Sequence, residues 1–399
     1  MNILFLTIGR MQSIETHGIY PDLLRSFRDQ GHKIYTVSPY EKRTGLKTEL
    51  VDENGTQMLH VSIGNITKCN IIEKGISTLQ IESKFRSAIK KYFKNVKFDL
   101  VMYSTPPITF AKVIKYIKKR DGARTYLLLK DIFPQNAVDI GMMTKSGVKG
   151  ILYKFFRNKE KKLYAFSDRI GCMSQANVDF VIKNNPEVSP EKVEICPNSI
   201  EIQDMSISEQ ERKDMREKYG IPLDKKVFVY GGNLGRPQGI PFLIDCLKTQ
   251  ENNEDAFFLI VGDGTEYGKL EEHFNEAQPK NMKLMQRLPK DDYDKMVAAC
   301  DVGMIFLDYR FTIPNFPSRL LAYMQAGVPV IACTDPNTDV GKTIVDGGFG
   351  WWCLSNDASG FDKVVSEALN ADFDLMKKNA FAKLKAEYTV DKTRDIILK

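Results

Sequence analysis

The stretch YGGNLGRPQGI, residues 230–240, follows the apolar run KVFVYG and precedes the helix-like segment PFLIDCLK. The order predicts a buried strand, a glycine-rich turn and a helix that begins near Gly239 and Pro241. Free backbone amides and the helix dipole can bind a phosphate at such a helix start. The turn is therefore a candidate site for a phosphorylated ligand.

The spacing of the glycines helps to decide which kind of phosphorylated ligand the turn would bind. Gly231, Gly232 and Gly235 do not form G-x-G-x-x-G, and no acidic residue about 20 positions further on ends a second strand, as dinucleotide binding would require. NAD is therefore disfavoured. The diphosphate of an activated sugar and a turn without any ligand both stay open.

Apolar runs alternate with amphipathic segments along the whole chain, as in parallel strands joined by crossover helices. The 399 residues, 43% of them hydrophobic, suffice for two cores, because a single core rarely exceeds about 300 residues. We predict two doubly wound Rossmann-like α/β domains facing across a cleft, joined by a polar connector near residues 198–225. The predicted strands lie near residues 2–8, 33–38, 99–103, 125–129, 169–173 and 193–196, and in KVFVYG, AFFLIVG, NMKLM, DVGMIF, VPVIAC and FGWWC.

The amino-terminal segment and the cysteines predict a cytoplasmic protein. MNILFLTIGR has no basic leader, and its apolar run is too short for a bilayer span, so we expect a buried first strand. The seven cysteines form no CxxC pair and are odd in number, which favours a reducing compartment.

The charge is divided unevenly. Residues 1–200 carry a net charge of +13, from 32 Lys and Arg against 19 Asp and Glu, whereas residues 201–399 carry −7. Three stretches interleave Lys and Arg with apolar residues: SAIKKYFKNVK, AKVIKYIKKR and VKGILYKFFRNKEKKLY. We expect peripheral binding to the anionic inner face of the cell membrane; a solvated helix face is the alternative for each stretch. Nucleic acid is not expected, because no recognised binding motif accompanies the charge.

A second helix start lies in IPNFPSRLLAYMQAGVPVIACTDPNTDVGK, residues 313–342. Pro317 is expected to open a helix and Gly327 to close it. Arg319 falls in the first turn, where it adds a forked cation to a helix terminus already suited to anions. Two such termini in one domain would bind two phosphates.

The chain resembles the family 4 glycosyltransferases of the GT-B type, in particular the bacterial branch that builds capsules, O-antigens and exopolysaccharides. The resemblance covers essentially the whole chain and rests on the order and spacing of several stretches: YSTPPITF, LLLKDIFPQNAVDIGMM, IGCMSQANVDFV, VEICPNSIE, YGGNLGRPQGI, VGDGTE and IPNFPSRLLAYMQAGVPVIA. It implies metal-independent sugar transfer with retained configuration, from a nucleotide sugar such as a UDP-sugar, and it implies no cofactor. The implied acceptor is a polyprenyl-diphosphate-linked sugar or another saccharide.

The resemblance also implies the domain roles. Residues 1–198 would bind the acceptor, residues 199–379 would bind the donor, and a helix from about 380 to 399 would cross back onto the first domain. The family's diphosphate grip, an Arg and a Lys five residues apart, is replaced here by Asn233 and Gln238, and two glutamates eight positions apart are replaced by Pro314 and Ala322. Arg236 and Arg319 are the expected substitutes for the missing cations.

The predicted donor-binding set combines the glycine-rich turn with the ends of neighbouring strands and the NFPSR segment, where Asn315 or Ser318 would hold the ribose. Asp263, which follows a strand, is either a donor contact or a helix-capping turn residue. The set is Gly231, Gly232, Asn233, Gly235, Arg236, Asp263, Leu288, Asn315, Pro317, Ser318 and Arg319.

On the acceptor side, Asp131 ends the strand RTYLLLK where family members carry a catalytic histidine or acid. Beside Lys130, it is expected to orient the acceptor hydroxyl and take its proton; a structural turn before Pro134 is the alternative. His17, Arg10 and Gly9 follow the first strand and are predicted sugar or acceptor contacts. A surface hydrogen-bonding role is the alternative for His17. The catalytic pair is thus Asp131 and Arg319.

No metal is assigned, since the D-x-D string in Asp291–Asp294 lies at an apparent helix start, where acids complement the dipole. Two other functions stay open. A nucleotide-sugar 2-epimerase shares the architecture but needs no lipid acceptor, and its usual carboxylate and histidine set is not evident. A non-catalytic partner subunit of a transferase would explain the missing glutamates.

Overall fold

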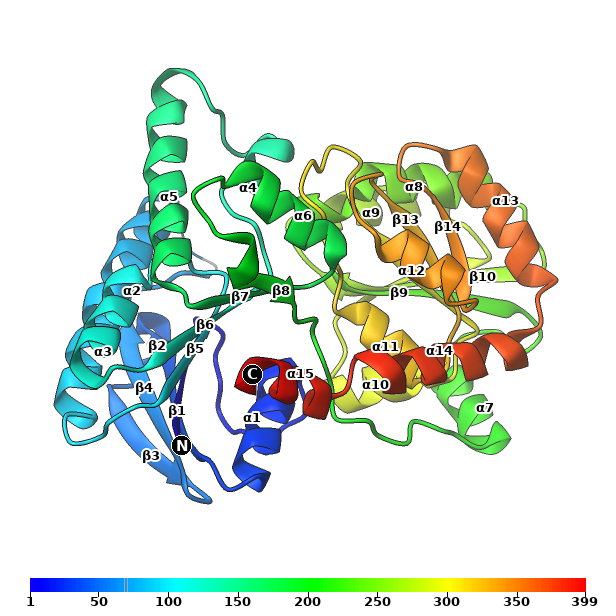
Figure 1. The fold of residues 1–399 in the computed structure, drawn as a ribbon. Coiled ribbons are helices and arrows are strands. Elements are labelled where there is room, and N and C mark those ends of the chain that lie inside the picture. Colours follow the sequence, from blue (N-terminus) through cyan, green and yellow to red (C-terminus); the bar gives the residue numbers. More distant parts are fainter. Residues whose placement is uncertain (68, 70) are drawn as a thin grey trace. The chain divides into compact units, whose positions relative to one another are not determined.

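The computed structural model of the protein describes residues 1–67, 69 and 71–399. The chain folds into two compact units: unit 1 contains Met1–Glu201 and Val390–Lys399, and unit 2 contains Ile202–Thr389. Each unit is a largely parallel sheet covered by helices (Figure 1). The predicted α/β class with two Rossmann-like domains is confirmed. Among the described residues, no helix combines the length and apolarity that crossing a bilayer requires.

The sheet of unit 1 has eight strands in the order β3-β4-β2-β1-β5-β6-β7-β8. The predicted runs form its core because large apolar side chains fill both faces of the central strands, and β1 and β5 are almost wholly buried. The strands are β1 Asn2–Leu6, β2 Lys33–Glu41, β3 Glu49–Glu53, β4 Thr56–Ile63, β5 Leu100–Ser104, β6 Arg124–Leu129, β7 Arg169–Cys172 and β8 Val193–Ile195.

The hairpin of β3 and β4 was not predicted. The two strands pair antiparallel, from Glu49 opposite His60 to Glu53 opposite Thr56. Asn54 and Gly55 form the turn with φ values of 51° and 82°, the conformation that an Asn-Gly turn favours. The residues of β3 are mostly exposed, and three of the five are acidic, so its sequence lacks the apolar alternation of a typical strand. The Asn-Gly dipeptide was the feature of the sequence that could have predicted the hairpin.

The helices of unit 1 cover both faces of its sheet. Val390 to Leu398 packs against α1, where Arg394 Nη1 donates to Ser26 O at 3.4 Å. The carboxy-terminal segment predicted to run from about 380 is thus two helices, and only the second lies in unit 1. The helices of this unit are α1 Ile19–Asp29, α2 Ile71–Tyr92, α3 Ala111–Asp121, α4 Gln135–Asp139, α5 Gly147–Phe166, α6 Gln175–Asn184 and α15 Val390–Leu398.

The sheet of unit 2 has six parallel strands in the order β11-β10-β9-β12-β13-β14. All six predicted runs form strands, and β9 lies near the centre, with its Val227–Gly231 segment buried. The strands are β9 Lys226–Asn233, β10 Ala256–Asp263, β11 Met282–Gln286, β12 Val302–Phe306, β13 Val330–Thr334 and β14 Gly350–Leu354. The helices are α7 Glu209–Lys218, α8 Ile240–Thr249, α9 Tyr267–Ala277, α10 Lys290–Ala298, α11 Arg319–Gln325, α12 Val340–Asp346, α13 Ala358–Leu369 and α14 Phe373–Glu387.

The polar segment predicted as a connector contains helix α7, which belongs to unit 2. Ser208 and Glu211 form a capping box at its start. Near its end, Arg216 is buried and pairs with Asp301 at 2.6 Å. Arg212 of the same helix pairs with the other oxygen of Asp301, also at 2.6 Å. Two arginines on one buried carboxylate therefore hold a helix whose residues are almost all polar, which is why its composition indicated a linker.

Candidate functional site

The end of β9 and the turn that follows it contain backbone conformations that only glycine reaches easily. Gly232 has φ 122°, and Gly239, immediately before α8, has φ 60°. A Cβ on Gly262 of β10 would lie 2.1 Å from the Gly232 carbonyl oxygen. The predicted sequence of strand, turn and helix is confirmed, and the backbone around Gly232 is packed too closely for side chains.

Asn233 and Gln238 stand at the two places where the resemblance would lead one to expect cations, and their side chains form a hydrogen bond with one another. Asn233 Nδ2 donates to Gln238 Oε1 at 2.8 Å, and the Gly235 amide donates to the same oxygen at 3.2 Å. This bond ties the end of β9 to the short helical turn that leads into α8. Neutral amide groups therefore stabilise the turn. A cation for a bound phosphate would have to come from another part of unit 2.

Arg319 supplies a cation beside this turn. Its Cζ lies 4.4 Å from the centroid of the Tyr230 ring, and a Cβ on Gly232 would lie 3.2 Å from its Nη2. Its Nη1 is buried and makes no hydrogen bond to any described residue. No described carboxylate pairs with it either. A partly buried guanidinium with an unmet donor is a candidate site for an anion.

Three tyrosines that the sequence reasoning missed surround this cation. Tyr323 Oη lies 3.2 Å from the carbonyl oxygens of Val229 and Met304, and a Cβ on Gly231 would lie 1.7 Å from Tyr293 Oη. Burial raises the pKa of Tyr323 to about 12 and also raises the pKa of Tyr230. The rings therefore stay neutral, and the Tyr230 face can stack on Arg319.

The other predicted donor residues are arranged less tightly. Arg236 is 56% exposed, and its Nε lies 3.6 Å from Glu266 Oε1, so its charge is partly shared. Asp263 is exposed at the end of β10. Leu288 lies two residues beyond the end of β11.

The NFPSR segment leads into α11. This helix begins at Arg319, two residues later than predicted, and the Ser318 side chain does not cap it. Pro317 O accepts the Leu320 amide, and Asn315 O accepts the Thr338 hydroxyl. The segment is thereby held to the turn after β13. Gly327, with φ 65°, follows the helix as predicted.

In unit 1, Asp131 and Lys130 follow β6 at the carboxyl edge of the sheet. Both backbone amides donate to Thr105 Oγ1, at 3.2 and 3.1 Å. Asp131 Oδ1 accepts a hydrogen bond from Asn136 Nδ2 at 2.7 Å, whereas Lys130 Nζ donates to the Cys196 carbonyl at 3.2 Å. The loop is thus fixed at both backbone and side chains.

Burial shifts the pKa values of Asp131 and Lys130 toward neutrality. It raises the pKa of Asp131 to about 6 and lowers the pKa of Lys130 to about 8. The hydrogen bond from Asn136 opposes the shift of the Asp131 pKa without cancelling it. A carboxylate with this pKa is mostly ionised at pH 7 and is still basic enough to accept a proton.

The predicted contacts after β1 line a small cavity within unit 1. Gly9 and Arg10 border it together with Thr7 and Tyr20, and its volume is about 210 Å³. The Gly9 amide donates to Thr7 Oγ1 at 3.0 Å. Arg10 is the exposed cation of the cavity lining.

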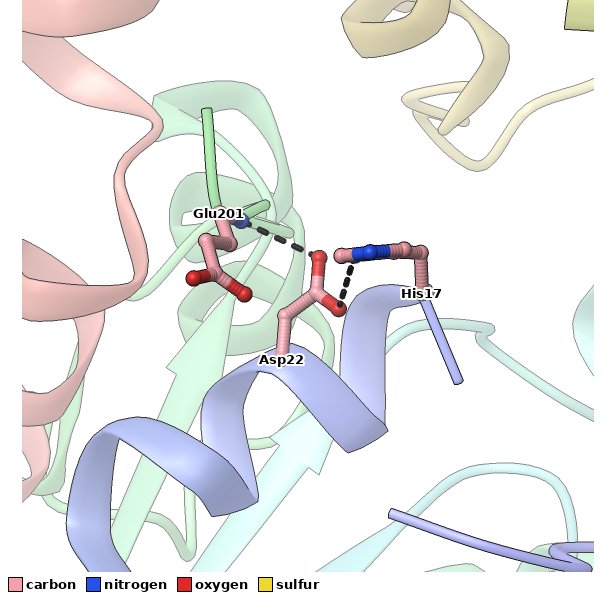
Figure 2. A group of neighbouring side chains, drawn as sticks. All are labelled: His17, Asp22 and Glu201. Atoms are coloured by element: carbon pink, nitrogen blue, oxygen red, sulfur yellow. Dashed lines mark hydrogen bonds and ion pairs between the residues drawn. The ribbon is translucent and has the colours of Figure 1, made fainter. Parts of the chain in front are cut away.

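His17 joins a cluster of charged residues in the same unit. Its Nδ1 lies 3.7 Å from Asp22 Oδ1, and the Glu201 amide donates to Asp22 Oδ2 at 3.0 Å (Figure 2). The ligating atoms of His17, Asp22 and Glu201 lie within 4.8 Å of one another, as a metal site would require.

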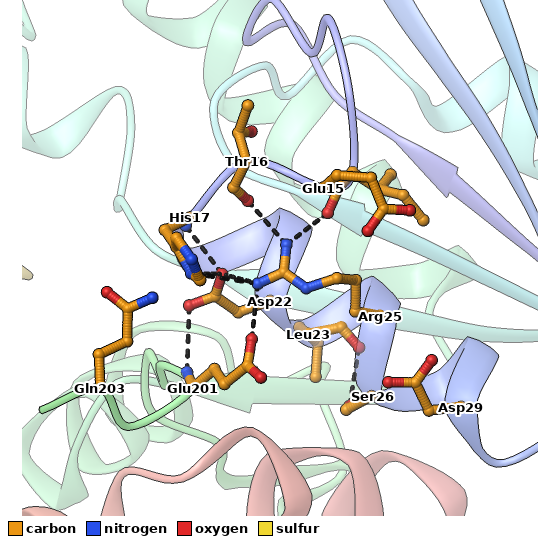
Figure 3. A network of polar contacts seen from close by, with 12 residues as sticks. Glu15, Thr16, His17, Asp22, Leu23, Arg25, Ser26, Asp29, Glu201 and Gln203 are labelled. Atoms are coloured by element: carbon orange, nitrogen blue, oxygen red, sulfur yellow. Dashed lines mark hydrogen bonds and ion pairs between the residues drawn. The ribbon is translucent and has the colours of Figure 1, made fainter. Parts of the chain in front are cut away.

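The guanidinium of Arg25 points into this same cluster. Figure 3 shows it between Asp22 and Glu201. Arg25 Nη2 donates to Asp22 Oδ1 at 2.6 Å and to Glu201 Oε2 at 2.7 Å, and Nη1 donates to Thr16 O at 2.7 Å. Arg25 already neutralises both carboxylates, so a cation would have to displace it. The cluster is accounted for as an ion-pair network that anchors Glu201 to α1.

Comparison with known proteins gives concordant matches. Residues 211–384 match the family "Glycosyl transferases group 1". The chain is 26% identical over 314 residues to "Probable glycosyltransferase WbjE" of Pseudomonas aeruginosa, covering 77% of this chain and 75% of that protein. It is 24% identical over 300 residues to "Putative colanic acid biosynthesis glycosyl transferase WcaI" of Escherichia coli K12, covering 74% and 71%.

The fold matches solved structures over its full length. Alr3699/HepE of Anabaena, solved in complex with UDP and glucose, superimposes with a TM-score of 0.70 at 15% identity, covering 100% of this chain and 98% of that one. The protein is therefore a glycosyltransferase with the GT-B fold.

Proposed function

We propose that the protein transfers a sugar from a nucleotide sugar, in particular a UDP-sugar, to a lipid-linked or saccharide acceptor in bacterial surface polysaccharide synthesis. We assign it to the family 4 branch, with retained configuration and no metal requirement. The observation that carries the proposal is the unpaired Nη1 of Arg319 beside Gly232. The relatives named for colanic acid biosynthesis and glycosyl transfer support the pathway, and UDP in the HepE structure supports the nucleotide.

Unit 2 would hold the donor. The diphosphate would accept hydrogen bonds from Arg319 and from the amides of the turn between Gly231 and Gly235. Because Tyr230 and the packed glycines fix the guanidinium in place, no reorganisation is needed when negative charge develops on the leaving diphosphate. The NFPSR segment, with Asn315 and Ser318, would hold the ribose in place of the missing glutamates.

Unit 1 would bind the acceptor. Asp131 would take the proton of the attacking hydroxyl, since its hydrogen bond to Asn136 orients one oxygen and leaves the other for the substrate. Lys130, held on the Cys196 carbonyl, would position the loop. Gly9 and Arg10 would contact the acceptor or the sugar from the cavity after β1.

UDP should stabilise the protein against heat. A ligand that binds only the folded state, present at about 100 times its Kd, adds about 2.7 kcal/mol, which corresponds to a rise of roughly 5–10 °C in the Tm of a unit of this size. Differential scanning fluorimetry with UDP, GDP and ADP measures this rise and identifies the base. The absence of a shift with any nucleoside diphosphate would contradict the donor site.

Arg236→Ala should have a small effect. Its side chain is exposed and already shares its charge with Glu266, and exposed ion pairs contribute at most about 1 kcal/mol. We expect the KM for the nucleotide sugar to rise by no more than about fivefold, with kcat unchanged. Steady-state kinetics measures both. If Arg236→Ala lost as much activity as we expect for Arg319→Ala, Arg236 rather than Arg319 would be the main cation of the donor site.

A further inference from the structure

Large apolar side chains lie exposed at the amino-terminal end of α5. Ile151 is 69% exposed, Leu152 50% and Phe155 40%, and Met142 in the preceding loop is 63% exposed. On a helix, Ile151 and Phe155 are one turn apart and lie on the same face. In Figure 1 the first turns of α5 extend beyond the strands of the unit 1 sheet.

The polar residues around this patch are basic. Lys145, Lys154 and Lys162 are exposed and have no carboxylate partner among the described residues. The one carboxylate of α5, Glu160, is buried and pairs with Arg157. The outer face of the helix therefore combines apolar side chains with uncompensated positive charge.

The other two basic stretches of this half are different. Val113, Ile114 and Ile117 of α3 are wholly buried, and so are Ile89 and Phe93 near the end of α2. The apolar residues of these two stretches belong to the core, so the lysines between them lie on solvated helix faces. Among the described side chains of the three stretches, large exposed apolar residues occur only in that of α5, although Leu163 and Tyr164 near its end are buried.

The position of α5 connects the patch to the proposed acceptor site. The helix lies on the crossover from β6 to β7, so it begins at the carboxyl edge of the sheet, where Asp131 also lies. Phe156, on the inner side of α5, packs on Phe133 with ring centroids 5.1 Å apart. The neighbouring Phe155 is exposed. One helix thus contacts the Asp131 loop on one face and presents the patch on another.

We propose that Met142, Ile151, Leu152 and Phe155, with Lys145, Lys154 and Lys162, dock unit 1 onto an anionic lipid bilayer. The apolar side chains enter the region between headgroups and acyl chains, and the ammonium groups bind lipid phosphates. This inference rests on the proposed function in one respect, namely that the acceptor is carried by a lipid. A second copy of this chain is disfavoured as the occupant, because pairing two such faces would bring like charges together.

Vesicle sedimentation with the full-length protein tests the docking. The probe is phosphatidylcholine vesicles with and without phosphatidylglycerol. We expect binding to the anionic vesicles alone, weakening as salt rises. Ile151→Ser/Leu152→Ser/Phe155→Ser should lower the partition coefficient at least ~10-fold, and Lys154→Glu/Lys162→Glu by at least ~10-fold, since each Lys contributes roughly fivefold.

Matched variants control for general effects of surface apolarity and charge. Leu46→Ser/Leu50→Ser/Val51→Ser removes three exposed apolar side chains near β3 of the same unit, and Lys342→Glu/Lys363→Glu reverses two exposed lysines of unit 2. Both should bind vesicles like the unmodified protein. The UDP-induced Tm shift should persist in every variant, so loss of docking and failure of the donor site give different results.

Several results would overturn the proposal. The proposal is wrong if the protein does not bind anionic vesicles, if it binds neutral vesicles equally well, or if the α5 variants bind as well as the control variants. A dimer in light scattering that the triple serine variant abolishes would assign the face to a second copy of the chain.

Discussion

Arg319→Ala is expected to reduce kcat/KM about 10²–10³-fold, the loss seen when one preorganised donor to a developing negative charge is removed. The guanidinium is stacked on Tyr230 and has an unpaired Nη1, so the substitution removes a cation that no described carboxylate balances. Steady-state kinetics with the nucleotide sugar and calorimetry with UDP measure the two consequences, slower transfer and weaker binding.

The control variants separate a functional role of Arg319 from a structural one. Arg319→Ala breaks no ion pair, so its Tm without ligand should stay close to that of the unmodified protein. Arg319→Lys should recover only part of the activity, because an ammonium lacks the forked donor and the planar stacking surface. Unchanged kinetics in Arg319→Ala would remove this residue from the donor site.

Asp131→Asn is expected to lower kcat about 10²–10⁴-fold, the contribution typical of a positioned general base. The amide keeps an oxygen that can accept the Asn136 hydrogen bond, so the loop should keep its shape. Measured turnover that equals that of the unmodified protein would show that another group takes the proton.

The pH dependence of the same residue has a definite sign. Because burial raises the pKa of Asp131 from 3.8 to about 6, the base is lost by protonation as pH falls below about 6, and kcat should fall with it. For stability the sign is opposite: the folded state holds this proton more tightly, so stability decreases as pH rises from 3.8 toward 6. Asp131→Asn should therefore be as stable as the unmodified protein at pH 7, or more stable, although it is nearly inactive.

That combination distinguishes a base from a structural turn residue. A carboxylate that only stabilised the loop before Pro134 would make its substitution destabilising. Kinetics and thermal unfolding of one variant, measured across the pH range, decide between the two. An inactive variant with a clearly lowered Tm at pH 7 would favour the structural role.

The sequence by itself determined the α/β class and the positions of all strands except β3 and β4, because buried parallel strands require continuous apolar runs. It also located the turn at Gly231–Gly235 and the Arg319 helix, since glycine and proline mark such boundaries locally. It mistook α7 for a linker, because the ion pairs of Arg212 and Arg216 with the buried Asp301 outweigh an almost wholly polar composition.

Only the tertiary structure decided what surrounds these residues. Tyr230, Tyr293 and Tyr323 come from β9, α10 and α11, and their gathering around Arg319 depends on long-range packing that no local pattern encodes. The raised pKa of Asp131 has the same origin, because desolvation is a property of the fold around a group. Exposure likewise separated the basic stretch of α5 from those of α2 and α3, because all three interleave basic and apolar residues and only burial shows which apolar side chains belong to the core.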